Sequence, residues 1–223
     1  MLNLKRKLYL LLHVILRPSG KYRLLSKFPK GTKILDIGAG KSPNRIKFLF
    51  PDIHYTGIDI IDHFVNKKNM SDNYLLTDTK NFTKLLDKNI NKFTCSISSH
   101  NLEHVDQREI ILNKSISTVK KGGFFYLSFP SKNTINLDRG RSGTLNYFDD
   151  PTHKALPPNV DDIISVLKSN NFKIIKLKIG YKPIILWLIG LILEPISKIS
   201  KKVLPGTLQF HGFETIIIAK REI

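Results

Sequence analysis

Apolar residues recur along the chain in short runs that alternate with longer segments of helical spacing. The runs are rich in Ile, Leu and Phe, as in strands that are buried on both faces. Strands are expected at 33–37, 53–59, 73–78, 93–98, within 119–130, at 172–179 and at 213–219. Helices are expected at 3–16, 43–50, 80–88, 105–119 and 158–170. Strands that alternate with helices in this way predict an α/β domain with a doubly wound sheet.

The first expected strand runs directly into Gly38-Ala39-Gly40. Glycine lets the backbone turn sharply there and lets a ligand approach it closely. Pro43 suits the first position of the helix that follows. The dinucleotide fingerprint fails because Pro43 stands at its third glycine, and the phosphate-loop pattern fails because Leu35 stands at its first glycine.

The acidic residue Asp36 followed by this glycine loop resembles the first motif of the class I methyltransferases that depend on S-adenosylmethionine (SAM). Asp59 lies 19 residues after Gly40, close to the spacing of about 20 at which a carboxylate accepts hydrogen bonds from ribose hydroxyls. The resemblance places Asp78 beside the adenine, and the alternative for this residue is a turn or a helix cap. The cofactor-binding residues that it implies are Asp36, Gly38, Ala39, Gly40, Asp59, Ile60, Asp78, Thr79, Ser98 and Ser99.

Two later stretches extend the resemblance across 33–130. The segment 102–104, Leu-Glu-His, matches the end of the family's fourth motif, although Thr94 stands where an Asp is usual. The double glycine at 122–123 matches the turn before the fifth strand, with Lys121 in place of a proline. The resemblance implies a Rossmann-like doubly wound sheet of seven strands, six parallel and one antiparallel edge strand, with helices on both faces.

Four residues are candidates for the chemistry: His100, Glu103, His104 and His153. Methyl transfer to an alcohol needs a group that removes its proton or polarises its oxygen, and imidazole titrates near neutral pH. His153 lies in a long polar loop and is the first choice for this base, with His100 and His104 as the others. The four also resemble E-x-x-E-H, the divalent-metal motif of ubiquinone-pathway and small-RNA methyltransferases, with His100 in place of the first Glu. The alternative is that Glu103 and His104 brace the helix start, as in relatives that use no metal.

Composition narrows the setting. With 223 residues and a hydrophobic fraction of 41%, the chain is expected to form one SAM-dependent methyltransferase domain over 1–223. The single Cys95 excludes a disulfide framework and a cysteine-built metal site, and it fits a cytosolic setting. The formal net charge of +18 favours anionic partners such as nucleic acid, acidic lipid headgroups or a phosphorylated substrate.

Two segments combine apolar and basic residues. An amphipathic helix is expected within 1–20, either packed on the sheet or lying at a membrane surface. An insertion at 181–207, between the sixth and seventh strands, carries the apolar stretch 184–193 with lysines after it. This stretch of ten residues is too short to span a bilayer, which needs about 20. An interfacial anchor, a buried helix and a dimer contact are the alternatives, and the oligomeric state stays open.

The segment 149–153, Asp-Asp-Pro-Thr-His, and the proline-led helix after it resemble bacterial methyltransferases associated with glycan and lipopolysaccharide assembly. This resemblance implies O-methylation of a saccharide or a lipid-linked saccharide, by a cytoplasmic protein that is peripheral at the inner face of the membrane. RNA ribose O-methylation is the alternative that the charge and the histidines favour. A non-catalytic SAM-fold protein at a membrane is the third interpretation. The segment 99–102 replaces the Asn/Asp-Pro-Pro-Tyr motif, which argues against methylation of adenine bases.

Overall fold

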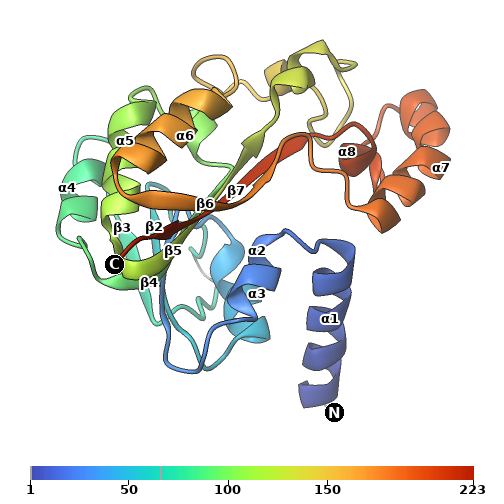
Figure 1. Ribbon diagram of the computed structural model, residues 1–223. Coiled ribbons are helices and arrows are strands. Elements are labelled where there is room, and N and C mark those ends of the chain that lie inside the picture. Colours follow the sequence, from blue (N-terminus) through green and yellow to red (C-terminus); the bar gives the residue numbers. More distant parts are fainter. Residues whose placement is uncertain (1, 66) are drawn as a thin grey trace.

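A seven-stranded sheet forms the centre of the computed structural model, which describes residues 2–65 and 67–223 (Figure 1). Its strands are β1 (Lys33–Ile37), β2 (His54–Asp59), β3 (Asn73–Leu76), β4 (Phe93–Ser99), β5 (Val119–Pro130), β6 (Phe172–Lys178) and β7 (Glu214–Arg221). They lie in the order β3-β2-β1-β4-β5-β7-β6. The order reverses between β1 and β4, the kind of position at which open α/β sheets bind ligands.

Six strands run in parallel, and β7 runs antiparallel to both of its neighbours, β5 and β6. The expected class of doubly wound sheet is therefore confirmed, including its strand directions. Only the place of the antiparallel strand differs, because β7 lies one position inside the edge and β6 forms the edge. The burial pattern explains this order: β7 is buried over its first six residues, whereas β6 alternates with lysines that suit an exposed edge.

Helices cover both faces of the sheet (Figure 1). On one face lie α4 (Phe82–Asp87), α5 (Arg108–Ser117) and α6 (Val160–Ser169), and on the other lie α2 (Lys21–Leu25) and α3 (Ser42–Leu49). Alternate residues of a strand point to opposite faces of the sheet and so contribute to both cores. In β1, Leu35 and Ile37 pack in the core under α4, α5 and α6, and Ile34 packs in the core under α2 and α3. Both cores are apolar, so the polar residues at the strand ends are left for a site.

Three further helices stand at one end of the molecule: α1 (Leu2–Leu16), α7 (Ile184–Ser200) and α8 (Thr207–Phe210) (Figure 1). α1 contacts α2, α3 and α7, and α7 packs on α8. The expected N-terminal helix and the insertion between β6 and β7 are thus both present, with Met1 outside the described residues. α7 is longer than the expected apolar stretch, because the helix continues through Pro195. No helix in the described part of the chain is long and apolar enough to cross a membrane.

Element boundaries differ from expectation near the strand ends. The strand expected at 73–78 ends at Leu76, and the helix expected at 105–119 begins only at Arg108. Between β4 and α5 the chain forms one 3-10 turn, Leu102–His104. Polar side chains in these segments hydrogen-bond to nearby backbone groups in place of regular helix or strand bonds. The strand and the helix are therefore shorter at the end of the sheet where a ligand would bind.

Two loops also differ in detail. The double glycine at 122–123 lies inside β5 and not before it; Gly122 adopts φ +72°, a region that suits glycine. The long loop at 131–157 contains two 3-10 turns, Lys132–Asn136 and Tyr147–Asp149. The second turn is fixed by a capping box, which gives this loop a defined path back toward the end of β4.

Candidate cofactor and acceptor site

The loop after β1 allows close approach to its backbone. Gly38 and Gly40 have φ values of +69° and +52°, which residues with a side chain rarely adopt. A Cβ atom on Gly38 would lie 2.4 Å from Asn101 Oδ1, so the loops that follow β1 and β4 meet here. A Cβ on Gly40 would meet nothing within 4 Å, which leaves that side of the loop open to a ligand.

Asp59, at the end of β2, holds this loop in place. Its Oδ2 accepts a hydrogen bond from the Gly40 N–H at 2.7 Å. Its Oδ1 accepts from the N–H groups of Ile60 and Ile61 at 2.7 and 3.1 Å. The sequence assigned Gly40 and Asp59 to one site, and the structure brings them into direct contact. A carboxylate oxygen can accept a further hydrogen bond, so this geometry fits the ribose of a nucleoside.

Other expected cofactor residues lie in the strands behind the loop. Asp36 is buried in β1 and accepts a hydrogen bond from the Tyr55 hydroxyl at 2.8 Å. Burial raises the pKa of Asp36 to about 6, although Lys21 lies near it. Ala39 and Ser98 are buried as well, and Ala39 donates its N–H to a carbonyl of β2. These buried residues support the glycine loop and are not exposed to a ligand.

Ile60, Asp78 and Thr79 lie at the ends of β2 and β3 and are exposed. The Asp78 carboxylate accepts the backbone N–H of Asn81 at 2.8 Å, just before α4. This is the turn or cap contact that was the alternative for Asp78. The hydrogen bonds from Asn81 lower the pKa of Asp78, so the carboxylate is ionised at neutral pH.

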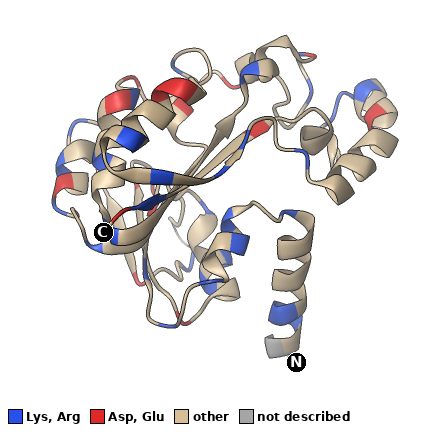
Figure 2. Cartoon of the chain, in the orientation of Figure 1, with Lys and Arg blue, Asp and Glu red and all other residues tan. Residues whose placement is uncertain are grey.

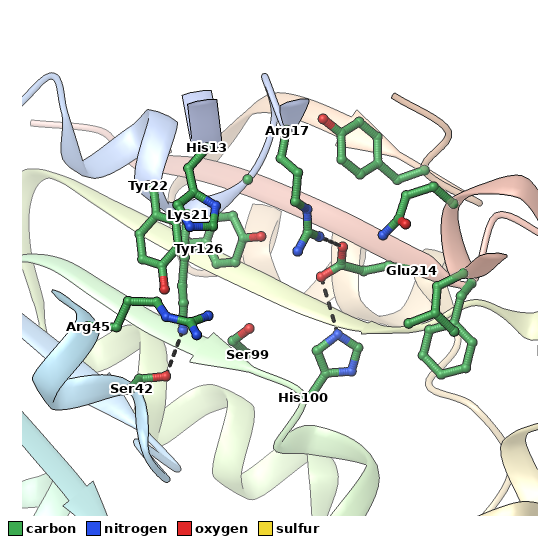
Figure 3. Close-up of a pocket in the computed structure, with 15 residues that line it drawn as sticks. His13, Arg17, Lys21, Tyr22, Ser42, Arg45, Ser99, His100, Tyr126 and Glu214 are labelled. Atoms are coloured by element: carbon green, nitrogen blue, oxygen red, sulfur yellow. Dashed lines mark hydrogen bonds and ion pairs between the residues drawn. The ribbon is translucent and has the colours of Figure 1, made fainter. Parts of the chain in front are cut away.

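A pocket of about 340 Å³ opens at the start of α3, the helix that follows the glycine loop (Figure 3). We call it the basic pocket; its charged lining residues are Arg17, Lys21, Arg45, His100 and Glu214, with His13 beside them. The residues come from α1 and the segment after it, from α2, from α3, from the end of β4 and from the start of β7. Of the expected site residues it contains Ser99 and His100, whereas His104 and His153 lie outside it.

His100 is held between two carboxylates. Its Nδ1 lies 3.2 Å from Glu103 Oε1, and its Nε2 lies 3.2 Å from Glu214 Oε1. Glu214 also forms an ion pair with Arg17. Burial disfavours the charged imidazole, but the two carboxylates outweigh burial and raise the pKa of His100 to about 9. His100 is therefore a cation at neutral pH and lacks the lone pair that a base needs.

The backbone of His100 is left-handed, with φ +51°, so His100 does not share a helix face with Glu103 and His104. The structure groups the expected metal ligands differently. Ligand atoms of Glu103, His104 and His153 all lie within 4.8 Å of one another, and we call these three residues the Glu103 cluster. Glu103 Oε2 is buried there with no hydrogen-bond partner in the described part of the chain.

The histidines of the Glu103 cluster are oriented by their neighbours. His153 Nδ1 lies 2.7 Å from the Tyr147 carbonyl oxygen, to which it donates, and this leaves the lone pair on Nε2. His104 Nδ1 lies 2.8 Å from Thr152 Oγ1. The long loop after β5 thus reaches the fourth-motif segment, and a buried unpartnered carboxylate oxygen beside two imidazoles fits a divalent metal.

Sequence reasoning missed most of the basic pocket. Arg17, Lys21, Arg45 and Glu214 lie in none of the motifs, and they meet only because α1, α2, α3 and β7 converge. One signal was present for Glu214, which opens an otherwise apolar run that forms a buried strand. A carboxylate at such a position is rarely buried without a partner.

A glycine loop at the topological switch point, held by a carboxylate from the next strand, defines an α/β domain that binds a nucleoside-containing cofactor. The chain belongs to the methyltransferase domain family, which it matches over residues 9–177. SAM is the cofactor of this class, and the Asp59 carboxylate beside the glycine loop fits its ribose.

Solved structures with this fold include two SAM-dependent methyltransferases. The protein from Archaeoglobus fulgidus is 20% identical with a TM-score of 0.58, over 96% of this chain and 99% of that chain. The protein from Mesorhizobium loti is 15% identical with a TM-score of 0.55, over 89% of this chain and 96% of that chain. An uncharacterized protein of Methanocaldococcus jannaschii is 33% identical over 110 residues, which are 46% of this chain but only 29% of that protein. These similarities establish the fold and leave the acceptor to be argued from the site.

Proposed function

We propose that this protein transfers the methyl group of SAM to a hydroxyl of a saccharide or a lipid-linked saccharide. The observation that carries the proposal is the path of the basic pocket. Ser42 and Ser99 line it beside the glycine loop, and Leu208 and Phe213 line it beside α8, which packs on α7. The pocket therefore extends from the start of α3, which follows the glycine loop, to α8, which packs on the apolar helix α7. Its hydroxyl and guanidinium groups supply hydrogen bonds of the kind that sugars make.

The reaction is an in-line displacement. The acceptor oxygen forms a bond to the methyl carbon while the carbon–sulfur bond breaks, and the sulfide leaves with the electron pair. Alignment of the three atoms supplies much of the rate acceleration. In the proposed arrangement the loop at Gly38 and Gly40 holds the amino-acid tail of SAM, and Asp59 holds the ribose. The acceptor then lies in the basic pocket near Ser99 and His100.

The Glu103 cluster is the proposed centre for activating the acceptor hydroxyl. Two imidazoles and one carboxylate favour a transition metal over Mg²⁺. A bound metal would polarise the acceptor oxygen as a Lewis acid. His153 is the proposed base, because its Nε2 keeps a lone pair, and His104 lies beside it with ring centroids 4.9 Å apart. The cationic His100 is better suited to positioning the acceptor than to removing its proton.

Exposed apolar faces on α1 and α7 support an acceptor at a membrane surface. In α7 the side chains of one face are 40–85% exposed; they are Ile185, Leu188, Ile192, Ile196 and Ile199. In α1 the corresponding side chains are Leu4, Leu8, Leu11 and Ile15. Figure 2 shows basic residues near the start of α1 and at the end of α7, with most of α7 uncharged. Apolar faces flanked by lysines suit anionic headgroups.

Incubation of the protein with methyl-labelled SAM and fractions of cells tests the acceptor. Label in a lipid-extractable saccharide is the expected result. Label in RNA would replace the proposal with ribose methylation, and label only in soluble sugars would remove the lipid from it. Calorimetric titration with SAM tests the cofactor separately: absence of binding at millimolar SAM would leave only the non-catalytic interpretation.

A further inference from the structure

The basic pocket contains more positive charge than its own acidic residue neutralises. Arg17, Lys21 and Arg45 reach into it from three different segments (Figure 3). Glu214 is the single carboxylate among its lining residues.

The partners of these cations show where the excess lies. Arg17 is paired with Glu214, and Lys21 donates to Ser42 Oγ at 3.0 Å with Asp36 at 4.0 Å. Arg45 hydrogen-bonds with the Tyr22 hydroxyl and forms no ion pair within the described residues. The excess positive charge is therefore located at Arg45, on the α3 side of the pocket.

Two nitrogen atoms of the lining also lack partners. His13 Nε2 and Arg17 Nε are buried and have no hydrogen-bond partner in the described part of the chain. Burial and the nearby charges of Arg45 and Arg17 lower the pKa of His13, as a positive potential requires. The Arg17 Nε–H is thus a buried donor without an acceptor among the described residues, close to a cation, Arg45, that has no ion pair there; such an arrangement is costly unless a ligand completes it.

We propose that the basic pocket binds a phosphate or carboxylate group of the methyl acceptor, with Arg45 as its main charged contact. This inference rests on the proposed function. The amino-acid tail of SAM also carries a carboxylate, so the cofactor is the other source of the same chemistry. The pocket continues past Ser42 to Leu208 and Phe213, beyond the glycine loop, and this extent favours the acceptor. A saccharide joined to a lipid through a phosphate ester would present its charge at this place.

The test is calorimetric titration of the full-length protein with inorganic phosphate, in the presence of saturating S-adenosylhomocysteine. That product of methyl transfer carries the carboxylate of SAM and fills the cofactor's own anion position. We expect phosphate to bind, and Arg45→Gln to weaken binding about tenfold, because a charge-assisted contact is lost. Lys168→Gln, an exposed lysine of α6 outside the pocket, is the matched control and should leave the affinity unchanged. Arg17 is unsuitable for substitution because its loss would leave Glu214 without its ion-pair partner.

Three outcomes would overturn the inference: no phosphate binding with or without S-adenosylhomocysteine, displacement of phosphate by S-adenosylhomocysteine (binding seen only in a parallel titration without it), or equal weakening in the Lys168→Gln control. Displacement would assign the pocket to the cofactor carboxylate, and equal weakening would mean unspecific attraction. Titration with S-adenosylhomocysteine alone reports on the proposed function. If S-adenosylhomocysteine does not bind, the proposed methyltransferase function is rejected. If S-adenosylhomocysteine binds but phosphate does not, only the proposed anion site is rejected.

Discussion

Gly38 is the residue on which the cofactor loop most depends. A side chain at this position would meet two obstacles: φ of +69° and Asn101 Oδ1 at 2.4 Å from a Cβ. We expect Gly38→Val to weaken SAM binding at least about a hundredfold, because the loop must move away from its contact with the segment after β4. Calorimetric titration with SAM measures the effect.

Gly31 provides the matched control for this prediction. It also has a positive φ, +75°, but a Cβ there would meet nothing within 4 Å. Gly31→Ala should therefore cost only about 1 kcal/mol of stability and leave SAM affinity intact. If Gly38→Val folds, by circular dichroism, and binds SAM like the wild type, the assigned cofactor loop is wrong.

Substitution of His153 tests the chemical step separately from cofactor binding. The residue lies in the Glu103 cluster and outside the basic pocket. We expect His153→Ala to reduce turnover about a hundredfold or more, as loss of a general base or metal ligand does, while SAM affinity stays the same. The metal content of the purified variant, measured by mass spectrometry, should fall as well if the cluster binds metal. His54→Ala, at an exposed histidine, is the control; equal activity of His153→Ala and wild type would exclude the loop histidine from catalysis.

At the scale of elements, α7 carries the largest exposed apolar face. We expect the double change Ile192→Lys and Ile199→Lys to reduce binding to vesicles of mixed anionic and neutral phospholipid about tenfold or more, because two exposed apolar side chains that would enter the lipid become charged. Flotation of the protein with vesicles measures this. Ile175→Lys in β6 is the matched control, since Ile175 is a half-exposed isoleucine on the far edge of the sheet.

The same experiment distinguishes lipid from a second copy of the chain. Wild type that fails to float with vesicles but sediments as a dimer would assign the α7 face to self-association. Sedimentation should then return to that of a monomer in the lysine variant. Either result would identify what covers this face, and vesicle binding that is unaffected by the lysines would contradict the membrane proposal.

The elements that the sequence predicted are those with a local signal. β1 is a short run with three apolar residues, β4 alternates apolar and polar residues, and α1 and α6 show helical spacing. α2 was not predicted, because its five residues are too few to show a period. β7 was predicted as a strand, but its place inside the edge depends on pairing with both β5 and β6, which no local pattern records.

The residues of the candidate site likewise fall into those that the sequence predicted and those that it did not. Gly40 and Asp59 were assigned together because their types and spacing recur in a known motif, and they are in contact. Arg17 and Glu214 are 197 residues apart in the chain, and only the closed fold brings them together. Sequence reasoning therefore predicted that Gly40 and Asp59 lie together, and it missed the charged residues of the basic pocket.

At the scale of the whole molecule, a series of ion pairs across the pocket connects a residue near the N-terminus with a residue near the C-terminus. Arg17, after α1, pairs with Glu214 at the start of β7, which contacts His100 after β4. Glu103 completes the series on the other side of His100. Burial opposes the charge on Glu214, but Arg17 and His100 lower the pKa of this carboxyl to about 2, so its stabilising contribution is present above its unfolded pKa and is lost only as pH falls through about 2.

His100 gives this series of ion pairs a pH dependence at the alkaline side. Its pKa is raised to about 9 in the folded protein, above the unfolded value of about 6.5, so the stabilisation is full below about pH 6.5 and is lost as pH rises through about 9. We expect the free energy of unfolding of wild type to exceed that of His100→Gln at pH 6. This difference should shrink at pH 9.5, where His100 loses its proton. The expected decrease is about 1–2 kcal/mol, because solvent screens part of the attraction between His100 and its two carboxylates. Urea denaturation at the two pH values measures it. A difference between wild type and His100→Gln that stays constant from pH 6 to 9.5 would mean that His100 is neutral in the fold, and it would restore His100 as a candidate base.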